Sequence, residues 1–445
     1  MKRLLLALVA CSCLSAQEPG LPLPPPVADQ PKQESRLRGH VDWQGHPAMH
    51  IPLGFLGENL DEGEPRWRLS WRHTFRQTMH VDYLTRSETR VLVAAAMAAE
   101  RGKDPEHARA LILEQLAYVR ELVGEHSEHF ALATTPEEAR RLLRSTRKTV
   151  VLHAIEGARH VLNSQEDADF WAKQGVMMVT LIHLQDDEFG GAGIRKALTA
   201  PLVNYRGSWR KLRGKRRGLT EQGQQAIVWL AKAGILVDLT HMSADAVVDS
   251  LEVTRRWGIP PLVTHGWARS IKADGRSFTD DQIVEVYRQG GCFQIPLSGG
   301  AIDPYKPTLE VPAGLRKGTL DSFVFHYRTL DALLKRNVGE VFPGVRCYDE
   351  LSEAQKTQLS VGWASDWNGW TNHSKPTHRG RKARRAQARG ELLEVDVRGL
   401  AHPGLLPEYW QRVEQAGVDM DPLLRQPEQL LRVWSAIRSW TPPVR

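Results

Sequence analysis

Short apolar runs alternate along the chain with segments whose apolar positions recur every three to four residues. The runs that we expect to be buried strands span 149–155, 176–182, 234–240, 261–264 and 291–295. The segments that we expect to be helices include 136–145, 165–174, 220–233 and 244–257, several of them opened by a capping Ser, Thr or Asp. Such strand-helix alternation predicts an α/β fold with a parallel sheet.

The repeated units suit either a closed barrel or a doubly wound open sheet. A nucleotide-binding sheet of the second kind would carry a Gly-rich phosphate loop after its first strand, and none follows here. We therefore predict a (β/α)8 barrel of the metal-dependent hydrolase kind, with helical insertions. The stretch 90–124 shows helical periodicity without a strand pattern, so we expect it to be an insertion that covers one end.

The N-terminus has the layout of an export signal. Two basic residues precede the apolar run 4–10, which is too short to cross a bilayer. Cleavage before Cys11 would produce a lipoprotein acylated on that cysteine, whereas cleavage after Ala16 would release a soluble protein. We favour Cys11 as the lipidation site, because small residues lead directly into it at the end of the apolar run.

Composition changes after residue 36. Residues 18–35 are rich in proline and polar residues and cannot bury apolar area, whereas the remainder can bury a large core. We expect a signal peptide at 1–10, a lipid-anchored Pro-rich tether at 11–36 and one barrel domain at 37–445. The expected location is the periplasmic face of the outer or inner bacterial membrane, with a secreted or soluble periplasmic protein as the alternative.

Only two cysteines, Cys292 and Cys347, remain in the part expected to fold. An exported protein with so few cysteines depends on core packing and metal rather than on a disulfide framework. A single bridge between the two stays open.

The formal net charge of +7 is concentrated in two segments. Residues 206–217 and 375–389 each carry seven basic and no acidic residues, and without them the balance would be −7. We interpret both as solvated loops, and a patch for phosphate-rich polymers or anionic lipid headgroups is the alternative. No nucleic-acid partner is expected, because the chain leaves the cytoplasm.

Metal-competent side chains follow four of the apolar runs directly, at Glu156, His183, His241 and His265. In a (β/α)8 barrel the carboxyl ends of the strands converge on one face, so residues distant in sequence can share an ion. Histidine and carboxylate ligands suit zinc or a similar divalent ion. Asp366 follows a further strand-like run and suits transfer of a proton to a leaving amine.

Several motifs share an order and spacing with one known family. The longer ones are Gly218-Leu219-Thr220-Glu221-Gln222-Gly223, Gly234-Ile235-Leu236-Val237-Asp238-Leu239-Thr240-His241-Met242-Ser243 and Pro261-Leu262-Val263-Thr264-His265. The shorter ones are Ile155-Glu156-Gly157, Leu181-Ile182-His183, Ser365-Asp366-Trp367-Asn368-Gly369, and Arg276 before Thr279-Asp280-Asp281. The sequence thereby resembles the membrane (renal) dipeptidase family of the amidohydrolase superfamily, as a divergent bacterial member.

The resemblance implies a zinc-dependent hydrolase that cleaves the amide bond of dipeptides with a metal-activated hydroxide. It implies that Glu156 bridges two zinc ions and that His241 and His265 bind one of them. Two ions are expected, and one ion is the alternative.

The resemblance also implies three roles toward the substrate. His183 would polarise the scissile carbonyl, Arg276 would hold the substrate carboxylate, and Asp366 would transfer the proton. The expected partners are a small peptide substrate and a lipid anchor, and homodimer formation stays open. The alternatives are a catalytically impaired barrel lipoprotein that binds peptides or wall fragments, and a related amidohydrolase that acts on N-acyl amino acids or lactones.

The first strand should supply two ligands spaced i and i+2, which point to the same side. In one register these are His40 and Asp42, the His-x-Asp pair of the best-known members. In the other they are Gln44 and His46, which we favour because this alignment keeps Asp42 and Pro47 in step with more divergent relatives. A neutral glutamine is a poorer zinc ligand than imidazole, so the first metal would bind weakly or be absent.

Overall fold

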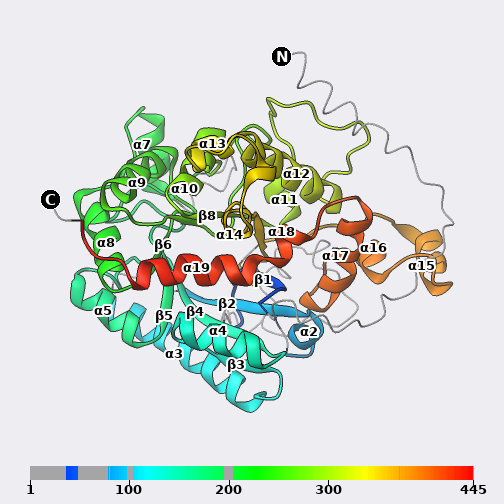
Figure 1. Cartoon of the computed structure of the whole chain (residues 1–445), viewed down its shortest axis with the longest axis horizontal. Coiled ribbons are helices and arrows are strands. Elements are labelled where there is room, and N and C mark those ends of the chain that lie inside the picture. The colour runs from blue at the N-terminus through cyan, green and yellow to red at the C-terminus, as the bar shows by residue number, and fades with distance from the viewer. Residues whose placement is uncertain are drawn as a thin grey trace.

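The computed structural model describes residues 37–48, 79, 81–97, 104–194, 204–369 and 371–443. Within these ranges eight parallel strands close into a barrel (Figure 1), because β2 pairs with both β1 and β4. In sheet order the strands are β2 (Thr89–Met97), β1 (His40–Gly45), β9 (Gly362–Ala364), β8 (Cys292–Pro296), β7 (Leu262–Val263), β6 (Leu236–Asp238), β5 (Val176–Thr180) and β4 (Thr149–Glu156). A ninth strand, β3 (Phe130–Leu132), pairs with the first residues of β4. The predicted (β/α)8 fold is therefore confirmed.

Helices surround the ring and bury their apolar faces against it (Figure 1). Most of the outer layer is formed by α3 (Pro105–Glu125), α4 (Pro136–Ser145), α5 (Gln165–Lys173), α8 (Glu221–Lys232), α9 (Ala244–Trp257), α10 (Asp280–Arg288), α12 (Leu320–Arg336), α17 (Leu406–Gln415) and α19 (Gln426–Arg438). The shorter helices are α2 (Val81–Arg86), α7 (Tyr205–Leu212), α11 (Gly299–Ile302), α13 (Val338–Val341), α14 (Glu353–Gln358), α15 (Gly380–Ala388), α16 (Glu394–Arg398) and α18 (Asp421–Leu424). None of the helices described combines the length and apolar character needed to cross a bilayer.

The prediction of one continuous helical insertion at 90–124 was wrong in its first part. Residues 89–97 form the barrel strand β2, and the helix α3 begins only at Pro105. Three consecutive alanines, Ala94, Ala95 and Ala96, favour a helix in isolation. In the fold they are buried between β1 and β4, where tertiary packing overrides that local preference.

The two basic segments are also more ordered than the loops that we expected. Residues 206–217 include most of α7, and residues 375–389 include α15. Cys292 and Cys347 are both free, so no disulfide joins them. The expected signal peptide, tether and lipidation site at Cys11 lie outside the described residues.

Buried neutral histidines make the fold sensitive to acid. Burial lowers the pKa of His153, and of His40, His326 and His402, to about 3. Below the unfolded-state pKa of about 6.5 the unfolded chain binds more protons, so stability falls as the pH falls toward 3. Each such histidine costs about 2 kcal/mol between pH 7 and pH 5.

We therefore expect urea unfolding to show a lower free energy of unfolding at pH 5 than at pH 7. His153→Leu removes one titrating ring, whose two nitrogens have no hydrogen-bond partner among the described residues, and should shrink that difference by about 2 kcal/mol. An unchanged difference in the variant would contradict this account.

Candidate metal centre

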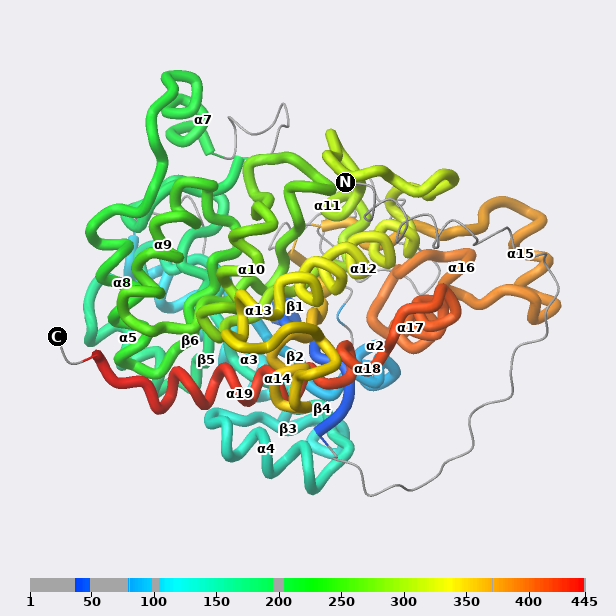
Figure 2. Tube along the Cα trace, turned by 45° about the horizontal axis from the view of Figure 1, so that its top comes forward, coloured from blue at the N-terminus to red at the C-terminus, as the bar shows by residue number. Residues whose placement is uncertain are grey.

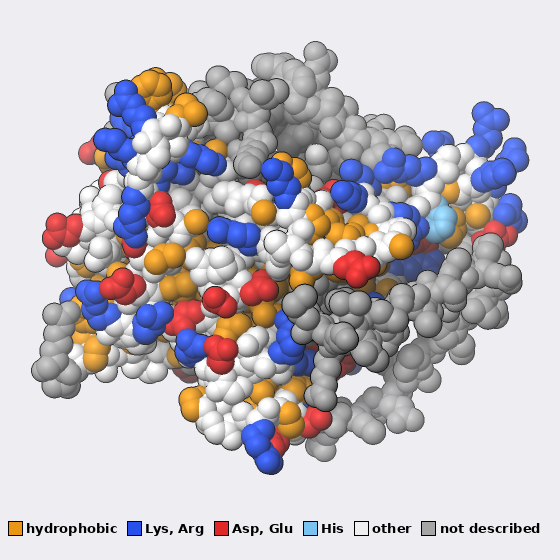
Figure 3. All heavy atoms as spheres, turned by 90° about the horizontal axis from the view of Figure 1, so that it is seen from above, with side chains coloured by type: hydrophobic (Ala, Val, Ile, Leu, Met, Phe, Trp, Pro, Cys, Tyr) orange, Lys and Arg blue, Asp and Glu red, His pale blue; other side chains and the backbone are white. Residues whose placement is uncertain are grey.

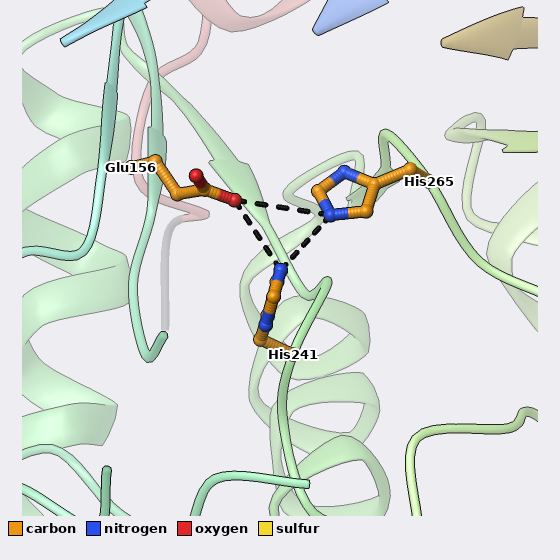
Figure 4. A group of neighbouring side chains, drawn as sticks. All are labelled: Glu156, His241 and His265. Carbon is orange, nitrogen blue, oxygen red and sulfur yellow. Dashed lines mark hydrogen bonds and ion pairs between the residues drawn. The ribbon is translucent and has the colours of Figure 1, made fainter. Parts of the chain in front are cut away.

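Glu156 ends β4 and its carboxylate faces two buried histidines, His241 and His265 (Figure 4). Its Oε1 atom is 3.3 Å from His241 Nε2 and 3.8 Å from His265 Nε2. The two imidazole nitrogens are 2.9 Å apart. The three side chains come from the ends of β4, β6 and β7 and point toward one another, as ligands of a single cation would.

A second group meets the other oxygen of the same carboxylate. His46 Nε2 is 3.1 Å from Glu156 Oε2 and 3.4 Å from Asp366 Oδ1. The Nε2 atom of Gln44 is 3.4 Å from the same imidazole nitrogen. One glutamate therefore stands between two candidate metal groups, an arrangement that suits a carboxylate bridging two ions.

His183 and Arg276 lie close to these groups without belonging to either. His183 Nε2 is 3.7 Å from Glu156 Oε2, and its ring is 4.4 Å from that of His241. The guanidinium carbon of Arg276 is 5.1 Å from the centre of the Trp267 ring. The charge of Arg276 also contributes to lowering the pKa of the His241 imidazole, so both side chains lie near the metal groups.

The structure distinguishes between the two first-strand registers. The ring of His40 stacks on Trp410 at 4.7 Å. Asp42 accepts hydrogen bonds from Ser365 N at 2.8 Å and Ser365 Oγ at 2.5 Å. The alternative pair therefore lies nearer the amino end of β1, where Asp42 supports the backbone after β9 and His40 packs against Trp410. His46, directly after β1, reaches Glu156, and the side chain of Gln44 contacts His46.

Hydrogen bonds orient the imidazoles. His46 Nδ1 donates to the Ala95 carbonyl at 3.0 Å, so that Nε2 is the ring nitrogen that faces Glu156. His265 Nδ1 is 3.0 Å from Thr264 Oγ1, which donates to Asp238 Oδ2 at 2.8 Å and so accepts from the ring. Ring orientation through such partners is typical of metal-binding histidines.

Asp238 is a positioning residue that the sequence analysis missed. Its buried carboxylate also accepts from Thr180 Oγ1 at 2.6 Å and Thr240 Oγ1 at 2.7 Å, and so ties together the ends of β5, β6 and β7. The available signal was a threonine immediately before each of two candidate histidines, His241 and His265, with an aspartate in an otherwise apolar strand.

The backbone at the site is held in an uncommon conformation. His241, Asp366 and Asn368 have φ values of 70°, 53° and 64°, in the left-handed region that residues other than glycine rarely adopt. Asn368 donates from Nδ2 to the His46 carbonyl at 3.0 Å. A Cβ at Gly369 would lie 1.7 Å from Asp366 Oδ1, so only glycine fits beside this carboxylate. Such local strain is common at functional sites.

The charges of the site are coupled. Burial opposes ionisation of Glu156, but His183, His241 and His46 hold the pKa of this carboxyl well below its usual range. Burial likewise opposes protonation of His46, but Asp366 and Glu156 raise its pKa to about 10. Burial lowers the pKa of His241, so its ring is neutral, the form that binds a metal ion.

Replacing Thr264 with valine tests the orienting hydrogen bond. The variant keeps the shape of the side chain but leaves His265 Nδ1 without its acceptor. We expect the affinity for Zn²⁺ to fall about 10- to 100-fold in a competition titration. Thr264→Ser, which retains the hydroxyl, should restore most of the affinity, and equal affinities in all three proteins would contradict the role.

Sequence comparison links the chain to one family. The model of "Membrane dipeptidase (Peptidase family M19)" matches residues 64–349. An uncharacterised dipeptidase of Schizosaccharomyces pombe is 26% identical over 214 residues, 48% of this chain and 45% of the relative. Dipeptidase ataJ of Aspergillus terreus is 24% identical over 203 residues, 43% of this chain and 47% of the relative. The chain thus spans about half the length of the curated relatives it matches.

Solved structures share the fold over nearly their whole length. A metallo peptidase from Rhodobacter sphaeroides, liganded with a phosphinate mimic of the dipeptide L-Ala-D-Ala, has a TM-score of 0.59 at 14% identity, covering 89% of this chain and 98% of that one. A probable dipeptidase, PvdM, from Pseudomonas aeruginosa has a TM-score of 0.58 at 15% identity, covering 91% and 96%. The match of the family model ends before Asp366 and begins after β1, so the first-strand pair and this acid are placed by the structure alone.

Proposed function

The chain belongs to the membrane dipeptidase family, and we propose that it is a metal-dependent hydrolase that cleaves the amide bond of dipeptides. The observation that carries the proposal is the position of Glu156, whose two carboxylate oxygens face two separate sets of ligand atoms. A structural ion pair would not need two further neutral imidazoles, from His241 and His265, on one oxygen.

The donor atoms at the site fit a divalent ion such as Zn²⁺. Glu156 Oε1 and Gln44 Oε1 are buried and accept no hydrogen bond within the described residues, so a cation at each of the two groups would supply the missing partners. His241, His265 and Glu156 would hold one ion, and His46, Asp366 and Glu156 would hold the other. An ion held there supplies Lewis acidity, which lowers the pKa of water and polarises an amide carbonyl.

The protein side chains would then position the substrate and move the proton. Arg276 carries a planar guanidinium that suits two hydrogen bonds to the C-terminal carboxylate of a short peptide. His183 Nε2 faces the same space and suits the scissile carbonyl oxygen. The side chain of Asp366 is 12% exposed, compared with 3% for Glu156, so it can exchange a proton with the leaving amine.

The proposed substrate is a dipeptide with a free carboxylate, and the cellular location proposed from the N-terminal sequence is outside the cytoplasm. The Rhodobacter sphaeroides relative was liganded with a mimic of L-Ala-D-Ala, which supports a small dipeptide as the first compound to assay. Fractionation of cells that express the full chain, together with release of amino acids from a panel of dipeptides, tests both points.

Metal content separates the enzyme from an impaired binding protein. Gln44 favours the second candidate, because its amide is a weak zinc ligand at the position where imidazole would be expected. Two tightly held ions per chain together with dipeptide hydrolysis would support the enzyme. At most one ion and no turnover would support a barrel that binds peptides without cleaving them.

Gln44→His should strengthen the weaker site. The new imidazole would stand beside His46 Nε2, and we expect the second zinc ion to bind at least about 10-fold more tightly. The measurement is zinc per chain by elemental analysis after dialysis. His40→Phe is the matched control, because it preserves the ring stack on Trp410 and should leave metal content unchanged. If His40→Phe loses metal and Gln44→His gains none, His40 rather than Gln44 is the metal ligand.

A further inference from the structure

A basic arm, residues 204–217, stands out from the barrel at α7 (Figure 2). Six large hydrophobic side chains are exposed among the described residues, and three of them lie on this short helix. They are Tyr205, Trp209 and Leu212, with exposed fractions of 69%, 48% and 81%. Scattered single apolar residues are normal on a surface, but three on one eight-residue helix indicate a contact surface.

The three apolar residues share one face of α7. Positions i, i+4 and i+7 form a narrow stripe along a helix. The opposite face carries Gly207, which is buried, and a Cβ there would approach Asn204, Arg217 and Asp186 within 2.6 Å. The helix therefore packs on the body of the protein through glycine and directs its apolar stripe away from it.

Cations flank the stripe. The exposed ones are Arg206, Arg210, Lys211, Arg213, Lys215 and Arg216. Viewed from above, Lys and Arg side chains gather around hydrophobic ones at the corner that α7 forms (Figure 3). An apolar stripe between basic flanks is the pattern of helices that lie in a membrane interface.

The base of the arm is fixed rather than loose. Asn204 Nδ2 donates to Asp186 Oδ1 at 2.9 Å, and Arg217 Nε donates to Asp186 Oδ2 at 2.9 Å. All three side chains are buried, so one carboxylate clamps both ends of the arm. Asn204 Oδ1 also caps α7 through Gly207 N at 2.9 Å. The arm thus presents its apolar face in a defined position.

We propose that the basic arm is a membrane-contact element that places Tyr205, Trp209 and Leu212 in the headgroup region of an anionic bilayer. Its cations would bind lipid phosphates, each adding to the attraction of the surface. Aromatic side chains with an apolar body and a polar tip favour that depth. A soluble polyanion would need the cations but would leave the apolar stripe in water.

The second basic segment offers an internal contrast. Helix α15 carries exposed Arg381, Lys382, Arg384 and Arg385, yet no large hydrophobic side chain is exposed on this helix. Its charge density matches that of the arm. The vesicle binding that is lost when α15 is neutralised therefore measures the contribution of electrostatic attraction without an apolar stripe.

The test is co-sedimentation of the full chain with vesicles, using Cys11→Ser in every sample so that acylation does not contribute. The vesicles contain phosphatidylcholine alone or an equal mixture with phosphatidylglycerol. The apolar variant combines Y205S, W209S and L212S, and the charge variant combines R206Q, K211Q, R213Q and K215Q. The matched control combines R381Q, K382Q, R384Q and R385Q.

We expect binding to the anionic vesicles only. The charge variant should lower the partition coefficient about 100-fold, the apolar variant about 10-fold or more, and the α15 control less than about 3-fold. If the charge variant and the α15 control lose vesicle binding equally and the apolar variant binds like the parent, the proposal is overturned in favour of non-specific electrostatic attraction. Polyphosphate that binds the parent and the apolar variant equally, without any vesicle binding, would overturn it in favour of a soluble polyanion. Unfolding temperatures within a few degrees of the parent confirm that each variant is folded.

Discussion

Glu156→Gln is expected to abolish dipeptide hydrolysis and to release both metal ions. The substitution keeps the size of the side chain but removes the negative charge that faces His46 on one oxygen and His241 on the other. Neutral amides are weak ligands, and the remaining groups on each side number too few to hold zinc tightly. We expect kcat/KM to fall at least about 1000-fold, about 4 kcal/mol of transition-state stabilisation, with zinc per chain below the detection limit of elemental analysis.

Glu285→Gln is the matched control for loss of a buried carboxylate. Glu285 is also largely buried and pairs with Arg255 at 2.8 Å and Arg288 at 2.7 Å. It lies on the outer helix α10 and belongs to neither candidate metal group. Its replacement should lower the free energy of unfolding and leave zinc content and kcat/KM within about 2-fold of the parent. Full zinc content in Glu156→Gln would contradict the assignment of this residue as the bridging ligand.

The main part of the site was predictable because strand ends are visible in a sequence. Glu156, His241 and His265 each follow an apolar run, and barrel topology brings such positions together without knowledge of any contact. The structure gathers all three within a few ångströms. Local pattern and global fold agree here, which is where inference from sequence is most reliable.

The first two strands show where that inference fails. β2 was missed because its alanines carry a helical preference that only pairing with β1 and β4 overrides. The ligand pair of β1 stayed open because His40, Asp42, Gln44 and His46 share a spacing of two. Which pair reaches Glu156 depends on how far β1 extends along the barrel axis, and that depends on its pairing with β2 and β9.

The outward apolar face of the basic arm was equally unpredictable from the sequence. From charge alone we predicted solvated loops for both basic segments, because a run of lysines and arginines does not show which face of a helix is buried. Packing of Gly207 against Asp186 determines that Trp209 faces outward, and this contact joins positions more than twenty residues apart. Sequence periodicity over an eight-residue helix is too short to reveal it.

Asp366→Asn is expected to lower activity strongly while one of the two zinc ions stays bound. Asp366 belongs to the group of His46 but not to that of His241 and His265, so one zinc ion should remain. Its carboxylate is the more exposed acid at the site, held beside His46 by a left-handed backbone and by the absence of a side chain at Gly369. Loss of a positioned proton donor lowers rates by about 100- to 10,000-fold, and we expect kcat/KM to fall about 1000-fold.

Asn368→Asp is the informative comparison for that variant. It adds a carboxylate next to Asp366 without removing the acid, so activity should persist, whereas the hydrogen bond from Asn368 Nδ2 to the His46 carbonyl is lost and the second ion should bind more weakly. Retention of one ion with loss of activity in Asp366→Asn, and retention of activity in Asn368→Asp, would place proton transfer on Asp366. Loss of both ions in Asp366→Asn would contradict this role. It would show that the group of Glu156, His241 and His265 cannot hold zinc without Asp366, so that the loss of activity reflects loss of metal.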